Sequence, residues 1–94
     1  MATLDDFLLS KACDKFQEDF EKQIKNLGYG LCHGNKHVNG QPVIFAGIHD
    51  YQNKGFTQID MEQIENILPK EYIFDSNKFP VKIGYLSQIT SIAF

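Results

Sequence analysis

Residues 30–49 read GLCHGNKHVNGQPVIFAGIH, and the Asn39-Gly40 pair in the middle of this stretch decides how the chain folds. A type I′ turn needs a positive φ at both of its central residues, and Asn followed by Gly is the pair that adopts it most readily. The runs on either side of the pair have the character of strands. We therefore predict a β-hairpin with strands over residues 30–38 and 41–49.

The register of this hairpin follows from the turn. Counting outward from the two turn residues places Val38 opposite Gln41 and Cys32 opposite Gly47. Because side chains alternate between the two faces of a strand, Cys32 and His49 share one face as diagonal neighbours, with their backbones about 7–8 Å apart.

The second strand is apolar on both of its faces. One face carries Val43 and Phe45, and the other carries Ile44, Ala46 and Ile48. Such a strand is buried on both sides or forms a contact surface. Two alternatives stay open. In the first, a helix covers the Val43 face and the isoleucine face binds a partner or a second copy of the chain. In the second, the helix buries the isoleucine face.

Residues 4–27 have the pattern of one long amphipathic helix. Apolar residues recur at helical spacing along one side, and charged residues occupy the other. Thr3 is placed to cap the first turn of the helix, and Gly28 is placed to end the helix at its C-terminus. The apolar positions are Leu8, Leu9, Ala12, Cys13, Phe16, Phe20, Ile24 and Leu27.

A second, shorter helix is predicted over residues 61–68. Asp60 is a good N-cap residue, Gln63 lies at the position of a capping box, and Ile59 with Ile64 matches a hydrophobic staple. Further strands are expected over residues 72–74, 79–85 and 89–94, with 56–59 as an additional candidate.

These elements predict a single α+β domain over residues 1–94. The long N-terminal helix and the short helix should form one layer, packed on a four- or five-stranded antiparallel sheet. The residues expected in the core are Phe16, Phe20, Ile24, Phe45, Ile64 and Ile83.

Composition argues against several classes of function. All nine basic residues are lysines, the net charge is −3 and the pI is near 5.5, which disfavours nucleic-acid binding. The longest apolar run is far too short to span a bilayer, and the first residues lack the basic region of a signal peptide. A cytoplasmic protein with two free cysteines and no membrane contact is therefore expected.

Catalytic and metal chemistry have weak support. A catalytic thiolate needs a nearby base or positive charge that lowers the pKa of the thiol. Cys32 and His49 are the cysteine and histidine that the predicted register places as neighbours. Adding His33 and His37 does not give the spacing of a zinc site, because neighbouring strand residues point to opposite faces. We expect no metal and no cofactor.

The functional prediction is therefore a non-catalytic protein–protein interaction module, such as a small acidic inhibitor, immunity or adaptor protein, with a homodimer as a further expectation. Residues 60–75 carry five carboxylates against one lysine and favour a basic partner. The predicted contact residues are Tyr51, Lys54, Phe56, Ile44, Ile48, Glu62 and Glu65. The alternative is a small thiol-dependent enzyme that uses Cys32 and His49.

Overall fold

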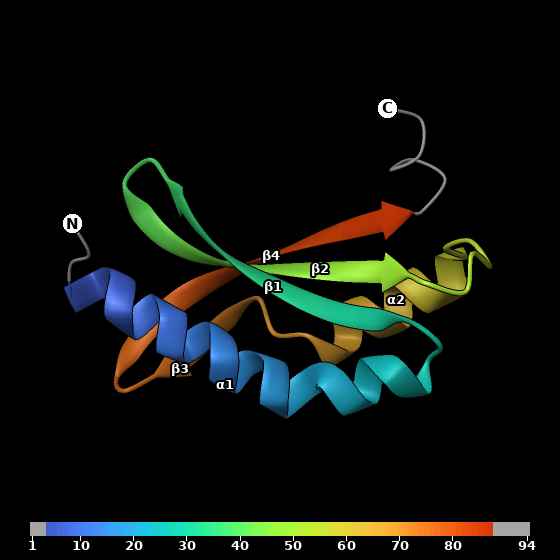
Figure 1. Ribbon diagram of the computed structural model, residues 1–94, viewed down its shortest axis with the longest axis horizontal. Helices are drawn as coiled ribbons and strands as arrows, with labels where there is room; N and C mark the ends of the chain where they lie inside the picture. Colours follow the sequence, from blue (N-terminus) through green and yellow to red (C-terminus); the bar gives the residue numbers. More distant parts are fainter. Residues whose placement is uncertain (1–3, 88–94) are drawn as a thin grey trace.

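A computed structural model describes residues 4–87 and contains two helices and one four-stranded sheet (Figure 1). This confirms the α+β class, with a long N-terminal helix and a short second helix. In chain order the elements are α1 (Leu4–Asn26), β1 (Gly30–Val38), β2 (Gln41–Asp50), α2 (Gln58–Ile67), β3 (Glu71–Phe74) and β4 (Asn77–Ser87).

The β1–β2 hairpin has the predicted register. Val38 pairs with Gln41 and Cys32 pairs with Gly47. Asn39 has a φ of 52° and Gly40 a φ of 80°, as the turn requires. Since this turn is set by two adjacent residues, local sequence was sufficient to predict it.

The sheet is mixed, so the prediction of a wholly antiparallel sheet was wrong. The strand order is β1-β2-β4-β3, and β4 lies beside β2 in the parallel direction. After β2 the chain passes through α2 and forms β3 at the outer edge. A tight turn with positive φ at Asp75 and Ser76 then returns it as β4 to the position next to β2. This long crossover is what permits the parallel pairing.

Two of the predicted strands are not part of the described sheet. Residues 56–59 form no strand, because Ile59 already belongs to α2. The strand expected over residues 89–94 lies outside the described residues.

Both helices cover the same face of the sheet, and α1 runs along its length (Figure 1). That face carries Ile44, Ala46 and Ile48, each with 0% of its surface exposed. The second of the two alternatives is therefore correct. Ile44 and Ile48 are core residues and not partner contacts, because the apolar side of α1 packs against them.

The predicted core is only partly correct. Phe16, Ile24 and Ile64 are fully buried, whereas Phe20 and Ile83 are partly buried at its border. Phe45 is only half-buried and lies on the side of the sheet that faces away from the helices. A strand that is apolar on both faces gave no local signal for which face the helix would choose.

Helix α2 begins one turn earlier than predicted. Its N-cap is Thr57, whose hydroxyl accepts a hydrogen bond of 3.1 Å from the backbone N–H of Asp60. The capping box at Asp60 and the staple from Ile59 to Ile64 were therefore wrong, and Ile59 is 67% exposed. The Asp60 side chain is instead engaged by the hydroxyl of Tyr29, which donates to it at 2.7 Å.

Three tyrosines tie distant elements together by donating to carboxylates. The pairs are Tyr29 with Asp60, Tyr72 with Asp19, and Tyr85 with Glu65. The hydrogen bonds from Tyr29 and Tyr72 lower the pKa of Asp60 and Asp19, because the ionised form is the stronger acceptor. Burial raises the pKa of all three tyrosines. These hydrogen bonds join α1 to β3, α2 to β4, and α2 to the connection between α1 and β1.

Candidate functional site

The aromatic loop after β2 is anchored by a buried carboxylate. Asp50 is only 1% exposed, and its two carboxylate oxygens accept hydrogen bonds from the backbone N–H groups of Lys54 (3.1 Å) and Gly55 (2.8 Å). The carbonyl of Asp50 also accepts from Asn53 at 3.1 Å. The loop is therefore held by hydrogen bonds to the last residue of β2.

Two of the three residues predicted as anchors in this loop make contacts within the protein. The Lys54 ammonium donates to the carbonyl of Leu27 at 2.8 Å and lies 4.3 Å from the centre of the Tyr29 ring. The Phe56 ring stacks on Tyr29 at 5.0 Å. Tyr51 differs, since 43% of its surface is exposed. Of the three, Tyr51 is the side chain most available to a partner.

The two acidic residues predicted as contacts lie on α2, which packs on the helix-covered side of the sheet. Both are exposed, and both make a hydrogen bond within the protein. Glu65 accepts from the hydroxyl of Tyr85, and Glu62 accepts from the side-chain amide of Gln58, each at 3.2 Å. The acidic surface is thus separated from the other side of the sheet.

We call the side of the sheet that faces away from the helices the open face. The sequence did not predict that the residues on this side form one surface. Among residues 4–87, no helix or strand packs on it. Strand alternation together with the register assigns its members. They are Cys32, Lys36 and Val38 from β1, Val43, Phe45 and His49 from β2, Glu71 and Ile73 from β3, and Lys78, Pro80, Lys82 and Leu86 from β4.

Two glycines make the centre of the open face flat. Gly47 and Gly84 are paired neighbours on β2 and β4. A Cβ at Gly84 would collide with the Phe45 ring, and a Cβ at Gly47 would lie 2.6 Å from the Cys32 sulfur. The side chains of Phe45 and Cys32 therefore lie down over the glycines. This close approach is the reason for glycine at both positions.

The thiol and imidazole predicted as a catalytic pair do share the open face. The thiol of Cys32 donates to the carbonyl of Gly47 at 3.5 Å, and His49 pairs with Gly30 one row further along the strands. Among the described residues, no three His, Cys, Asp or Glu side chains are grouped closely enough to hold a metal ion.

The two cysteines should differ sharply toward a thiol reagent at neutral pH. Burial raises the pKa of Cys13 to about 11, so its reactive thiolate is scarce, whereas Cys32 is exposed. We expect one equivalent of label in the native protein and two in denaturant, with mass spectrometry locating the first on Cys32. Two inert thiols in the native state would contradict the exposure of Cys32.

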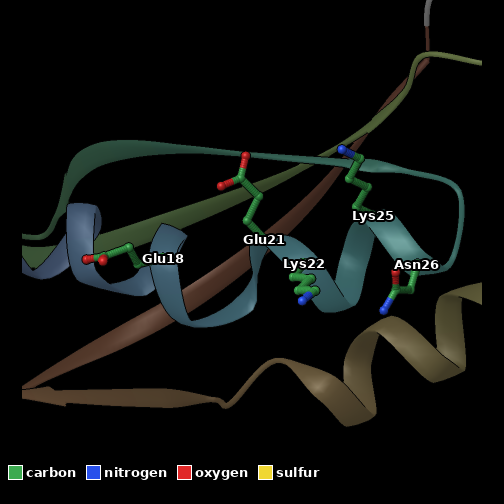
Figure 2. A pocket seen from close by; sticks show the side chains of 5 residues that line it. All are labelled: Glu18, Glu21, Lys22, Lys25 and Asn26. Carbon is green, nitrogen blue, oxygen red and sulfur yellow. The ribbon is translucent and has the colours of Figure 1, made fainter.

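A hollow on the outer side of α1 is lined by Glu18, Glu21, Lys22, Lys25 and Asn26 (Figure 2). All five side chains are exposed, and Figure 2 shows that they point to different sides of the helix instead of converging on one point. Its charged residues are two glutamates followed by two lysines. The hollow therefore has the character of a solvated helix surface and not of a reaction site.

No helix in the described part of the chain has the length and apolar character needed to cross a membrane. Comparison of the chain with family models, with curated proteins and with solved structures gives no match.

Proposed function

We propose that this protein is a non-catalytic protein–protein interaction module and that it binds its partner with the open face of the sheet. The observation that carries this proposal is the one-sided covering of the sheet. Both helices lie on one face, while the other presents apolar side chains with no described element over them. An exposed sheet face that carries several large apolar side chains on different strands is a candidate interaction site.

Large apolar side chains remain accessible across the open face. Val38 is 45% exposed, Ile73 is 64% exposed and Leu86 is 40% exposed. They come from three different strands, so the exposed apolar groups extend across the sheet. A flat sheet surface with a glycine-lined centre suits a protein partner, which needs shape complementarity over a wide area.

Tyr51 extends this surface at the β1 edge. Its ring lies 3.7 Å from the position that a Cβ would take at Gly30, and Gly30 pairs with His49 of the open face. Tyrosine on a fixed loop supplies contact area at a small cost in conformational entropy. In this proposal Lys54 and Phe56 support the loop from inside, and Tyr51 makes the contact. A cytoplasmic location belongs to the same proposal, since free thiols suit a reducing compartment.

A charged group in the open face should abolish partner capture, while the same group on another exposed apolar position should not. We expect Leu86→Asp to lose the proteins that the wild type retains from an extract of the native host, because an unpaired carboxylate would be buried in the contact. Ile59→Asp is the matched control, since Ile59 is an even more exposed apolar residue on α2. Quantitative mass spectrometry of the captured proteins measures the difference.

Equal capture by wild type and Leu86→Asp, with both folded by circular dichroism, would exclude the open face as the binding site. The thiol-dependent enzyme is the competing hypothesis, supported by the position of Cys32 and His49 on one face. It requires turnover that Cys32→Ser abolishes. Capture that survives Cys32→Ser, together with loss in Leu86→Asp, favours the interaction module.

A further inference from the structure

We infer that the partner of the open face is a protein surface that combines apolar groups with carboxylates. This inference rests on the proposed function and adds the chemistry of the partner. It replaces the basic partner that the acidic stretch of sequence favoured, because Asp60, Glu62 and Glu65 of that stretch lie on α2 and only Glu71 belongs to the open face.

The open face has an excess of positive charge. Lys36, Lys78 and Lys82 project from it and are exposed, against one carboxylate, that of Glu71. Within residues 4–87, none of these three ammonium groups lies within 4.0 Å of a carboxylate. Two lysines elsewhere in the described chain do have such a partner, Lys15 with Asp19 at 3.2 Å and Lys54 with Asp60 at 3.8 Å. The positive charge of the open face is therefore not neutralised within the protein.

Two of these lysines frame an apolar centre. The Lys36 ammonium lies 4.3 Å from the centre of the Phe45 ring, and Lys82 is the residue directly paired with Phe45 on β4. Leu86 and the glycine-lined centre continue the apolar surface along the strands. If a partner places an apolar side chain against this centre, the partner's adjacent side chains lie beside the two lysine ammonium groups. Carboxylates are the protein side chains that complement ammonium groups.

The sign of this charge is opposite to that of the whole protein. The chain has a net charge of −3, and five carboxylates lie within residues 60–75. Two of these, Glu62 and Glu65, are on α2, on the helix-covered side of the sheet. An acidic partner is therefore attracted by one face and repelled by the other, which selects its orientation before contact.

A protein is favoured over a single-stranded nucleic acid as the source of the negative charge. Sheets that bind single strands stack bases on free aromatic rings. Here one side of the Phe45 ring is taken by the Lys36 ammonium and another by the backbone of Gly84. The large apolar side chains exposed elsewhere on the open face, Val38, Ile73 and Leu86, are aliphatic, and the exposed ring of Tyr51 lies at the β1 edge beside Gly30.

Zero-length carbodiimide cross-linking tests the inference directly, because the reagent joins an amine only to a carboxylate that touches it. The carbodiimide activates the carboxylate, the amine displaces it to form the amide, and the reagent leaves as a urea that has taken up the water equivalent. The full-length protein is treated in the extract of its native host, and the linked peptides are identified by mass spectrometry. We expect amide bonds from Lys36 or Lys82 to Asp or Glu side chains of another protein. Links from Lys82 to Glu62 of a second copy would overturn the inference in favour of self-association.

Charge-reversal variants give the second measurement. The double variant Lys36→Glu with Lys82→Glu should weaken binding of the cross-linked protein by about tenfold or more, since both attractions become repulsions. The matched control, Lys22→Glu with Lys25→Glu, makes the same change in net charge on exposed positions of α1 and should change affinity less than about twofold.

The outcomes separate this inference from the proposed function. If Leu86→Asp abolishes capture but the two double variants bind equally well and no lysine of the open face is linked, the interaction surface stands and the acidic partner is wrong. If capture disappears after nuclease treatment, a nucleic acid is the ligand and the inference is overturned. If Leu86→Asp has no effect, the proposed function itself has failed.

Discussion

Replacing Phe16 with alanine should lower the free energy of unfolding by about 3–5 kcal/mol. The Phe16 ring has no exposed surface, and it contacts the Phe20 ring at 4.9 Å and the Tyr72 ring edge-on at 5.3 Å. Truncation removes these contacts and leaves a cavity where α1 meets β3. Domains have only about 5–15 kcal/mol of stability in total, so the midpoint of chemical unfolding should fall strongly.

The matched control for this variant is Phe7→Ala on the same helix. Phe7 is 57% exposed, and its ring is contacted by the Lys11 ammonium at 5.4 Å. A change at such a position is expected to stay within about 0.5 kcal/mol. Guanidinium unfolding followed by circular dichroism measures both variants. Equal midpoints for Phe16→Ala and wild type would show that the helix does not pack on the sheet as described.

Asp50→Ala should have the second largest effect, about 3 kcal/mol, because a hydrogen bond to a charged group contributes about 1.5–3 kcal/mol and two are lost. The backbone N–H groups of Lys54 and Gly55 would be left without their acceptor. The loop that carries Tyr51 should then become mobile. Thermal unfolding measures the stability, and faster amide exchange at residues 54 and 55 reports the freed loop.

Asp50→Asn separates the role of the charge from that of the shape. Its amide keeps one acceptor oxygen in place of two, so an intermediate loss of stability is expected. Glu21→Ala serves as the control, since Glu21 is an exposed carboxylate on α1. If Asp50→Ala were as stable as this control, the carboxylate would not be what holds the loop.

The candidate site shows where prediction from sequence stops. Strand alternation already placed Cys32 and His49 on one face, and the structure confirms that they share it. It did not indicate that Lys36, Phe45 and Lys82 form one surface, because Lys82 comes from a strand whose neighbour was not predictable. Their proximity depends on a pairing between residues 37 positions apart in the chain, from Phe45 to Lys82.

The sequence by itself determined the β1–β2 register, the extent of α1 and the existence of α2. Each of these depends on residues that are close together: the positive φ angles of Asn39 and Gly40, the 3.6-residue spacing of apolar side chains, and a side chain able to cap a helix. The N-cap of α2 was assigned to the wrong residue, because Thr57 and Asp60 are both suitable N-cap residues and lie only three positions apart. Local energy alone does not separate them.

Only the tertiary structure decided which face of β2 the helices cover and where β4 inserts. Val43 with Phe45 and Ile44 with Ile48 are comparable as apolar pairs, so the choice depends on the summed packing of both helices and on hydrogen bonds such as that from Tyr29 to Asp60. Packing energy of this kind depends on surfaces that exist only once distant segments have met. For that reason the open face, and with it the proposed interaction surface, is a property of the fold and not of any local stretch of the sequence.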